Sequence, residues 1–233
     1  EDIYGMDESG FPPSSQGRIR VIGAWGTKTQ HKQGGGVRTN VTALVTICAD
    51  GSALDPMIIF KGKNFIFAYS ENGWTDGCLA CEWIKKKFNA QTEDKANGRP
   101  RVLLVDGHSS HYTYELLQYA RAHNIIIFGY PPHCTHALQG LDVVCFARMK
   151  EVWKNEISAF KQLHKHSVTK ADFAGVFGRA FLDSFTVETI KAAFEATGIC
   201  PFNPNDISSE QTKPSLPTST KGSFPLAQPS PVR

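Results

Sequence analysis

The sequence has no long apolar run. No stretch approaches the ~20 consecutive apolar residues that a membrane-spanning helix needs, and no signal peptide is visible at its start, so we expect no membrane association. Cysteine is too sparse for a disulfide scaffold: the six cysteines among 233 residues lie mostly between apolar neighbours. This pattern favours buried, reduced thiols in an intracellular protein.

Neither sign of charge is in large excess, with 25 Lys and Arg against 22 Asp and Glu. The net charge of +3 permits a nucleic-acid partner but does not indicate one. Hydrophobic content of 41% and charged content of 20% are ordinary for a globular protein, and the length allows one substantial core. The chain begins at Glu1 rather than at a methionine, with apolar Ile3 already in a strand-like segment, so we expect a piece of a longer protein.

The order of the expected elements predicts an α/β fold, a mixed sheet with helices on its faces. Apolar periodicity, caps and turn residues predict strands over residues 1–6, 18–25, 40–48, 56–61, 102–105 and 125–128, and helices over 74–91, 113–124, 141–160, 169–183 and 186–198. Residues 27–38 are polar and glycine-rich, which is typical of a loop. From residue 208 the chain is Ser-, Thr-, Pro- and Lys-rich without periodicity, so we expect a disordered tail over 208–233 behind a folded domain over 1–207.

The most informative stretch is residues 101–111. Val102 to Val105 forms a short apolar run that is typical of a strand buried on both faces, and Asp106 and Gly107 follow it. A carboxylate at the end of a buried strand is unfavourable unless something compensates its charge, and a metal ion is one such compensation. Asp-Gly after a strand is also ordinary turn chemistry, and this stretch alone favours the turn.

Two further acids change that balance. Asp7 is expected to end the first strand, and Asp142 lies in the first turn of the helix after the last strand. If the first and central strands are neighbours, Asp7 and Asp106 lie side by side and repel each other. Divalent cations take carboxylate oxygens, and a third carboxylate completes a two-metal site with ions ~3.5–4 Å apart, as used for phosphoryl displacement.

Several segments resemble the catalytic blocks of pogo-type DDE transposases, the group with the Tigger, Jerky and centromere protein B-like domains. The three acid-bearing segments are Met-Asp-Glu-Ser-Gly-Phe at 6–11, Leu-Val-Asp-Gly-His-Ser-Ser-His at 104–111, and the stretch from Tyr130 through His-Ala-Leu-Gln-Gly-Leu-Asp at 136–142. Residues 46–63 and the closing Thr-Gly-Ile-Cys-Pro-Phe-Asn-Pro at 197–204 are also similar to that family. The resemblance covers about residues 1–207, and the separation of Asp106 and Asp142, 142 − 106 = 36 residues, is similar to the family's pattern.

The resemblance implies a ribonuclease-H-like fold with a helical C-terminal extension. It implies Asp7, Asp106 and Asp142 as ligands of two Mg²⁺ or Mn²⁺ ions, with cleavage of DNA at transposon ends and strand transfer by the freed 3′ hydroxyl. The implied partners are transposon-end and target DNA, with a homodimer in the DNA complex and a nuclear location. Gly140 stands where the family usually has proline, so we expect a looser loop before Asp142. The helix-turn-helix region that usually precedes this domain is not in the chain, so we expect weak, sequence-indifferent DNA binding.

Other residues allow simpler interpretations. Glu8 is expected to point away from Asp7, and His108 and His111 to support the acids or contact DNA. Cys78 and Cys81 have zinc-site spacing, but no second cysteine pair accompanies them. Candidates for phosphate contacts are Arg18, Arg20, Lys61, Lys63 and Arg148, whereas Lys85 to Lys87 are typical of a solvated helix face. The competing functions are a non-catalytic DNA- or chromatin-binding protein derived from a transposase, and a zinc-binding interaction module.

Overall fold

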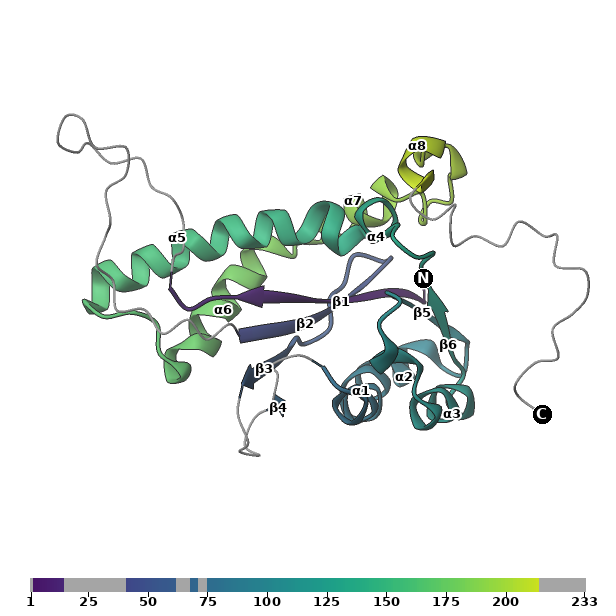
Figure 1. The fold of residues 1–233 in the computed structure, drawn as a ribbon, viewed down its shortest axis with the longest axis horizontal. Coiled ribbons are helices and arrows are strands. Elements are labelled where there is room, and N and C mark those ends of the chain that lie inside the picture. The colour runs from purple at the N-terminus through teal and green to yellow at the C-terminus, as the bar shows by residue number, and fades with distance from the viewer. Residues whose placement is uncertain (1, 15–40, 62–67, 71–74, 214–233) are drawn as a thin grey trace, which may run out of the picture.

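The computed structural model describes residues 2–14, 41–61, 68–70 and 75–213 (Figure 1). The segments expected at 18–25 and 27–38, and Lys63, lie outside the described residues. In the described part the sheet has the strand order β4-β3-β2-β1-β5-β6. The strands are β1 (Ile3–Phe11), β2 (Val41–Cys48), β3 (Met57–Lys61), β4 (Ala68–Ser70), β5 (Arg101–Val105) and β6 (Ile125–Gly129).

The sheet is mixed, as the order of elements predicts. β2 pairs antiparallel with β1 and with β3, whereas β5 runs parallel to both β1 and β6. β2 is buried at every position, which fits its unbroken run of apolar and Thr residues. β1 is therefore an interior strand, with an antiparallel neighbour on one side and a parallel neighbour on the other.

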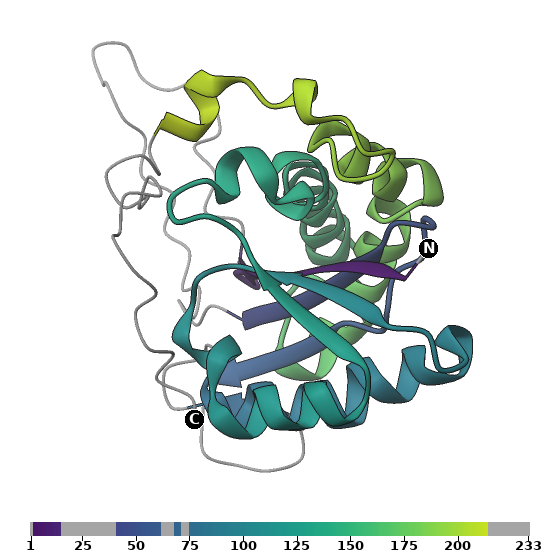
Figure 2. The same ribbon diagram turned by 90° about the vertical axis from the view of Figure 1, so that its right-hand side faces the viewer.

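Helices cover both faces of the sheet, as Figures 1 and 2 show. One face carries α5 (Phe146–His164), α6 (Lys170–Ser184) and α7 (Val187–Ala196), and the other carries α1 (Gly77–Trp83), α2 (Ala90–Ala96) and α3 (Tyr114–Ala122). Because side chains alternate along a strand, β1 serves both cores. Phe11 packs edge-on against Trp153 and Phe177 on the first face, and Tyr4 packs edge-on against Phe88 on the second.

The helix expected over 74–91 continues to Ala96, so its predicted end is wrong by five residues. α1 passes into a π-helical segment, η1 (Ile84–Asn89), and then into α2. Thr92 is fully buried and donates to the Phe88 carbonyl at 2.7 Å, and this inward-facing residue keeps the last turns on the sheet. The helix ends at Asn97, whose backbone is left-handed at φ +46°.

The predicted helix caps of the C-terminal half are confirmed. Thr169 and Asp172 form a capping box at the start of α6, and the Thr186 hydroxyl accepts from the Thr189 N–H at 3.3 Å at the start of α7. Gly198 adopts φ +62° after α7. These local signals set the bounds of the helices that cover the first face.

The disorder expected from residue 208 is wrong for its first residues. Ser208 caps a short helix, α8 (Ser209–Thr212), in a capping box with Gln211, and the Thr212 carbonyl lies 3.9 Å from the Cys134 Sγ. Residues 214–233 lie outside the described part. Among the described helices, we find none with the length and apolar character needed to span a membrane.

Candidate metal centre

Asp7 lies within β1, not at its end as expected. The strand continues to Phe11 because the residues after Asp7 pair with β2, from Asp7 opposite Val45 to Phe11 opposite Val41. This ladder overrides the turn tendency of Ser-Gly in the sequence. Asp7 shares the strand face of Phe11, towards α5 and α6, whereas the next residue, Glu8, faces the other way and accepts from the Thr75 N–H at 3.3 Å.

Asp106 directly follows β5, as predicted. β1 and β5 are parallel neighbours with Gly5 opposite Leu104, and continuing that register by two residues brings Asp7 opposite Asp106. Neighbouring strands are ~4.8 Å apart, and both acids occupy the strand face shared with Leu104. The condition left open in the sequence, that the first and central strands are neighbours, is therefore met.

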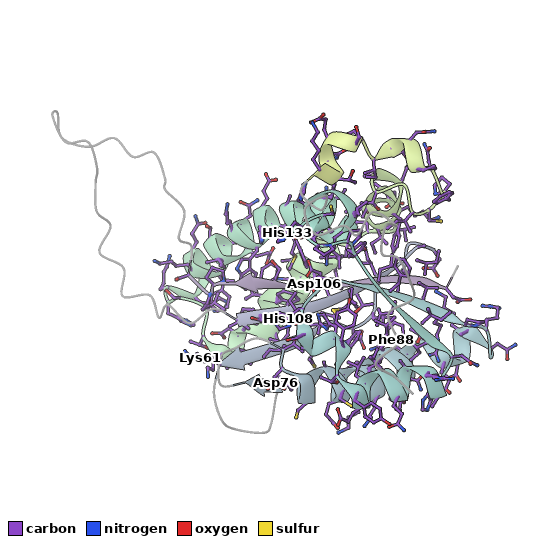
Figure 3. All side chains as sticks on the ribbon, turned by 45° about the vertical axis from the view of Figure 1, so that its right-hand side comes forward. Lys61, Asp76, Phe88, Asp106, His108 and His133 are labelled. Atoms are coloured by element: carbon purple, nitrogen blue, oxygen red, sulfur yellow. The ribbon has the colours of Figure 1, made fainter. Side chains whose placement is uncertain are left out.

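The carboxylate of Asp106 is held by the loop that follows it, and Figure 3 labels Asp106 and His108 of this loop near the middle of the molecule. Its Oδ1 accepts from the His108 N–H at 3.0 Å and lies 3.2 Å from Nε2 of the buried His111. The Tyr112 hydroxyl donates to the Asp106 carbonyl at 2.9 Å. His111 and Tyr112 belong to a single 3-10 turn, η2 (Ser109–Tyr112). The hydrogen bond from His111 lowers the pKa of Asp106. Partial burial raises this pKa by less, so the pKa stays below its ordinary value.

Asp142 lies in a π-helical turn, η3 (Leu141–Cys145), that leads into α5. The residue before this turn, Gly140, is buried, and a Cβ built on it would lie 2.5 Å from the Ala193 carbonyl oxygen of α7. Glycine is therefore required for this close packing, although its backbone is ordinary helical at φ −59°. The expectation that Gly140 loosens the loop is replaced by the opposite finding, that it lets the loop pack tightly.

The three acids influence one another electrostatically. Burial, followed by the charge of Asp142 and then that of Asp106, raises the pKa of Asp7 to about 8, against hydrogen bonds from the Glu8 backbone and the Gln139 side chain. Partial burial raises the pKa of Asp142 as well. The positive charge of Lys150 lowers this pKa, and the negative charge of Asp106 raises it. The hydroxyl of Tyr130 lies in the same environment: burial, then Asp7 and Asp142, raises its pKa. The acids are therefore neighbours without full charge compensation.

The donor chemistry of this centre fits a hard divalent cation, because it offers carboxylate oxygens with unrelieved mutual repulsion. As the side chains stand, no three His, Cys, Asp or Glu residues of the described part converge closely enough to hold a metal ion. The same finding applies to Cys78 and Cys81, whose thiols are free. The zinc interpretation therefore gains no further ligand among the described residues.

Two residues of this centre were not predicted as site residues. Gln139 is 2% exposed, and its Nε2 donates to the Met6 carbonyl at 3.3 Å. Tyr130 and Gln139 both line a cavity beside Asp7, together with Gly5 and Thr197. Gln139 contacts a strand 133 residues away in the chain, and nothing in the local sequence signals such a partner.

Known proteins provide the context for this geometry. The chain is 32% identical over 227 residues to the MFS-type transporter clz9 of Cochliobolus lunatus, covering 90% of this chain and 24% of that protein. It therefore spans about a quarter of that relative.

Solved structures of Mos1 transposase are similar in fold at low identity, and this chain spans little more than half of two of them. The paired-end complex with Mn matches with a TM-score of 0.59 at 12% identity over 87% of this chain and 56% of that chain. The strand transfer complex matches with 0.56 at 14% over 84% and 51%, and the catalytic domain with raltegravir and Mg with 0.53 at 11% over 84% and 78%.

These similarities establish the predicted ribonuclease-H-like fold, a mixed sheet flanked by helices as in the Mos1 catalytic domain. The family described as DDE superfamily endonuclease matches residues 38–194. This range includes Asp106 and Asp142, and it begins after Asp7. Because the match covers more than half of the sequence, the chain belongs to the DDE superfamily endonucleases.

Proposed function

We propose that this chain is the catalytic domain of a pogo-like DNA transposase, in which Asp7, Asp106 and Asp142 hold two Mg²⁺ or Mn²⁺ ions. The observation that supports the proposal is the register of β1 and β5, with Gly5 opposite Leu104, which aligns Asp7 with Asp106 when it is extended by two residues. Asp142 acts electrostatically on the same carboxylate. Membership of the endonuclease family and the Mg and Mn in the similar Mos1 structures support a divalent-metal reaction on DNA.

Bound metal would supply an activated water for hydrolysis of a DNA phosphodiester and stabilise the leaving oxygen. The chain's own residues determine where that chemistry occurs. β1 and β5 fix the backbones of the first two acids, and His108 and His111 occupy Oδ1 of Asp106, which leaves its Oδ2 as the oxygen for a ligand. Burial around Asp7 excludes water from one side of the centre and strengthens its electrostatic interactions.

The proposed partners are transposon ends and target DNA. The protein would bind them as a homodimer, in the nucleus. The paired-end and strand transfer complexes of Mos1 are the structural support for DNA partners. Of the candidate phosphate contacts, Lys61 is exposed at the end of β3, and exposed Arg148 donates to the Asp183 carbonyl. Arg18, Arg20 and Lys63 lie outside the described residues. Lys150, which acts on Asp142, joins these candidates.

A second candidate function is non-catalytic DNA or chromatin binding by a protein derived from a transposase. The observation in its favour is that the three acids, as placed, do not form a ligand set among the described residues. The two functions differ in one measurable respect, because a binding protein needs neither metal nor the Asp106 charge.

The test is nicking of supercoiled plasmid with Mg²⁺ or Mn²⁺ by the parent, Asp106→Asn and a control, Asp94→Asn. Asn keeps the volume and one oxygen but removes the charge that holds the metal, so Asp106→Asn should abolish cleavage. Asp94 is an exposed acid of α2 on the opposite face of the sheet, and its variant should cleave like the parent. Equal cleavage by the parent and Asp106→Asn would exclude the three-acid mechanism. A folded parent that cleaves with neither metal would favour the binding role.

A further inference from the structure

Gln139 occupies an unusual position between two of the acids. It is three residues before Asp142 in the sequence, yet its side chain reaches β1, where its amide Nε2 donates to the Met6 carbonyl at 3.3 Å. Met6 directly precedes Asp7, and the Gln139 side chain acts to lower the pKa of the Asp7 carboxyl. A primary amide can donate an N–H, and here it fixes the peptide group that leads into Asp7.

The backbone of Gln139 is fixed in both chain directions. Its N–H donates to the Thr135 carbonyl at 2.9 Å, and its carbonyl accepts from the Val143 N–H at 3.0 Å. The second of these bonds belongs to the first turn of the helix that carries Asp142. On the other side, Gly140 packs against the Ala193 carbonyl of α7. The segment is therefore fixed between β1 and α7, and the direction of the Gln139 side chain follows from its backbone.

The chemistry of an amide suits this position. A glutamate of the same size could not donate and would repel Asp7 when ionised, and a lysine would neutralise Asp7 and occupy the charge that a cation needs. An amide donates to the Met6 carbonyl, directly before Asp7, and leaves the negative charge of Asp7 in place. Its burial at 2% exposure also makes the bond insensitive to solvent competition.

We propose that Gln139 is a positioning residue that sets Asp7 and Asp142 at a fixed separation for metal binding. This inference rests on the proposed function. The Gln139 carbonyl is bound to the turn that carries Asp142, and its amide is bound to the residue before Asp7, so Asp7 and Asp142 would hold a metal as one ligand pair. Partners that orient metal ligands typically change metal affinity by 10–100-fold when removed, and we expect a loss of about that size in Mn²⁺ affinity from Gln139→Met.

The experiment measures Mn²⁺ affinity by isothermal titration calorimetry, and kcat and KM for plasmid cleavage, for the parent, Gln139→Met and Leu138→Ala. Methionine keeps the length and volume of glutamine without its donors. Leu138 is the half-buried neighbour that ends α4 (Thr135–Leu138), so its truncation disturbs the same loop. The expected result is weaker Mn²⁺ binding and a lower kcat for Gln139→Met, with an unchanged KM for DNA and a parent-like Leu138→Ala.

Each other outcome is decisive. Mn²⁺ affinity of Gln139→Met equal to the parent's overturns the positioning role and leaves the proposed function standing. An equal loss in Leu138→Ala overturns it too, because loop stability alone would then explain the effect. If Gln139→Met does not fold, Gln139→Leu is measured, and failure of both to fold assigns the residue to folding. If the parent itself binds no Mn²⁺, the proposed function fails first and the positioning role fails with it.

Discussion

Asp7 should make the metal-free protein less stable as the pH rises. Its folded-state pKa is raised from 3.8 to about 8, chiefly by burial, so between these values the folded state holds a proton that the unfolded state has lost. Stability rises with pH only where the unfolded state binds more protons, and here the folded state binds more. The free energy of unfolding should therefore fall from about pH 4 to about pH 8.

The magnitude follows from the size of the shift. One pKa unit corresponds to about 1.4 kcal/mol, so the difference between 3.8 and about 8 gives a ceiling of about 6 kcal/mol. Asp7 and Asp142 titrate together and share the penalty, so we expect about 2–4 kcal/mol for Asp7 alone. In a chain of this length, 1 kcal/mol shifts the Tm by about 2–4 °C, and Asp7→Asn should raise the Tm at pH 8 by about 4–16 °C.

Asp106→Asn provides a control of opposite sign. His111 lowers the pKa of Asp106, so the ionised carboxylate stabilises the fold above its unfolded pKa, and that contribution is lost as the pH falls through the folded value. Its removal should cost about 1–2 kcal/mol at neutral pH. The assay is thermal unfolding in EDTA from pH 4 to 9 for the parent and both variants. A parent and an Asp7→Asn variant with the same pH slope would refute the argument, as would stabilisation by Asp106→Asn.

Three further predictions concern packing, the tail and DNA. Gly140→Ala should destabilise the fold by about 1–3 kcal/mol, measured by urea unfolding, because its Cβ meets the Ala193 carbonyl; a change below about 0.5 kcal/mol would show that the loop can shift. Removal of residues 214–233 should leave the Tm unchanged, because their Ser-, Thr- and Pro-rich sequence has no apolar periodicity; a large drop would contradict this. DNA binding should weaken steeply as salt rises from 50 to 200 mM in fluorescence anisotropy, since Lys and Arg contact phosphates; tight, salt-resistant binding to one sequence would oppose it.

The sequence predicted those features that depend on local signals. The capping residues Thr169 and Thr186 mark the starts of α6 and α7 because a cap satisfies N–H groups within its own turn. The buried run before Asp106 marks β5 because a strand covered on both faces needs apolar residues at every position. The adjacency of Asp7 and Asp106 required one further condition, that β1 and β5 pair, which the sequence alone left open.

The features that escaped prediction depend on distant partners. Ser9 and Gly10 are typical of a turn, but pairing with Ala43 and Thr42 keeps them in β1, so Asp7 lies inside the strand. The bond from Gln139 to Met6 joins residues 133 positions apart. The packing of Gly140 depends on the backbone of α7. No propensity or spacing within a short window contains this information.

The partners of Asp7 and Asp106 explain why the repulsion between these acids is not relieved without metal. The Glu8 backbone and the Gln139 side chain lower the pKa of Asp7 less than burial raises it, and Asp106 is held by a backbone N–H and a histidine. An arginine or lysine in place of Gln139 would relieve the repulsion and stabilise the metal-free fold, but it would occupy the charge that a divalent cation requires. Stability without metal and affinity for metal are therefore opposed at this site.

A cation present at a free concentration of 100 times its Kd stabilises the folded state by about 2.7 kcal/mol, which is comparable to the penalty expected for Asp7. Mg²⁺ should accordingly flatten the fall in stability of the parent between pH 4 and 8 and leave Asp7→Asn almost unaffected, and an equal Mg²⁺ response of the two proteins would show that Asp7 is not a ligand.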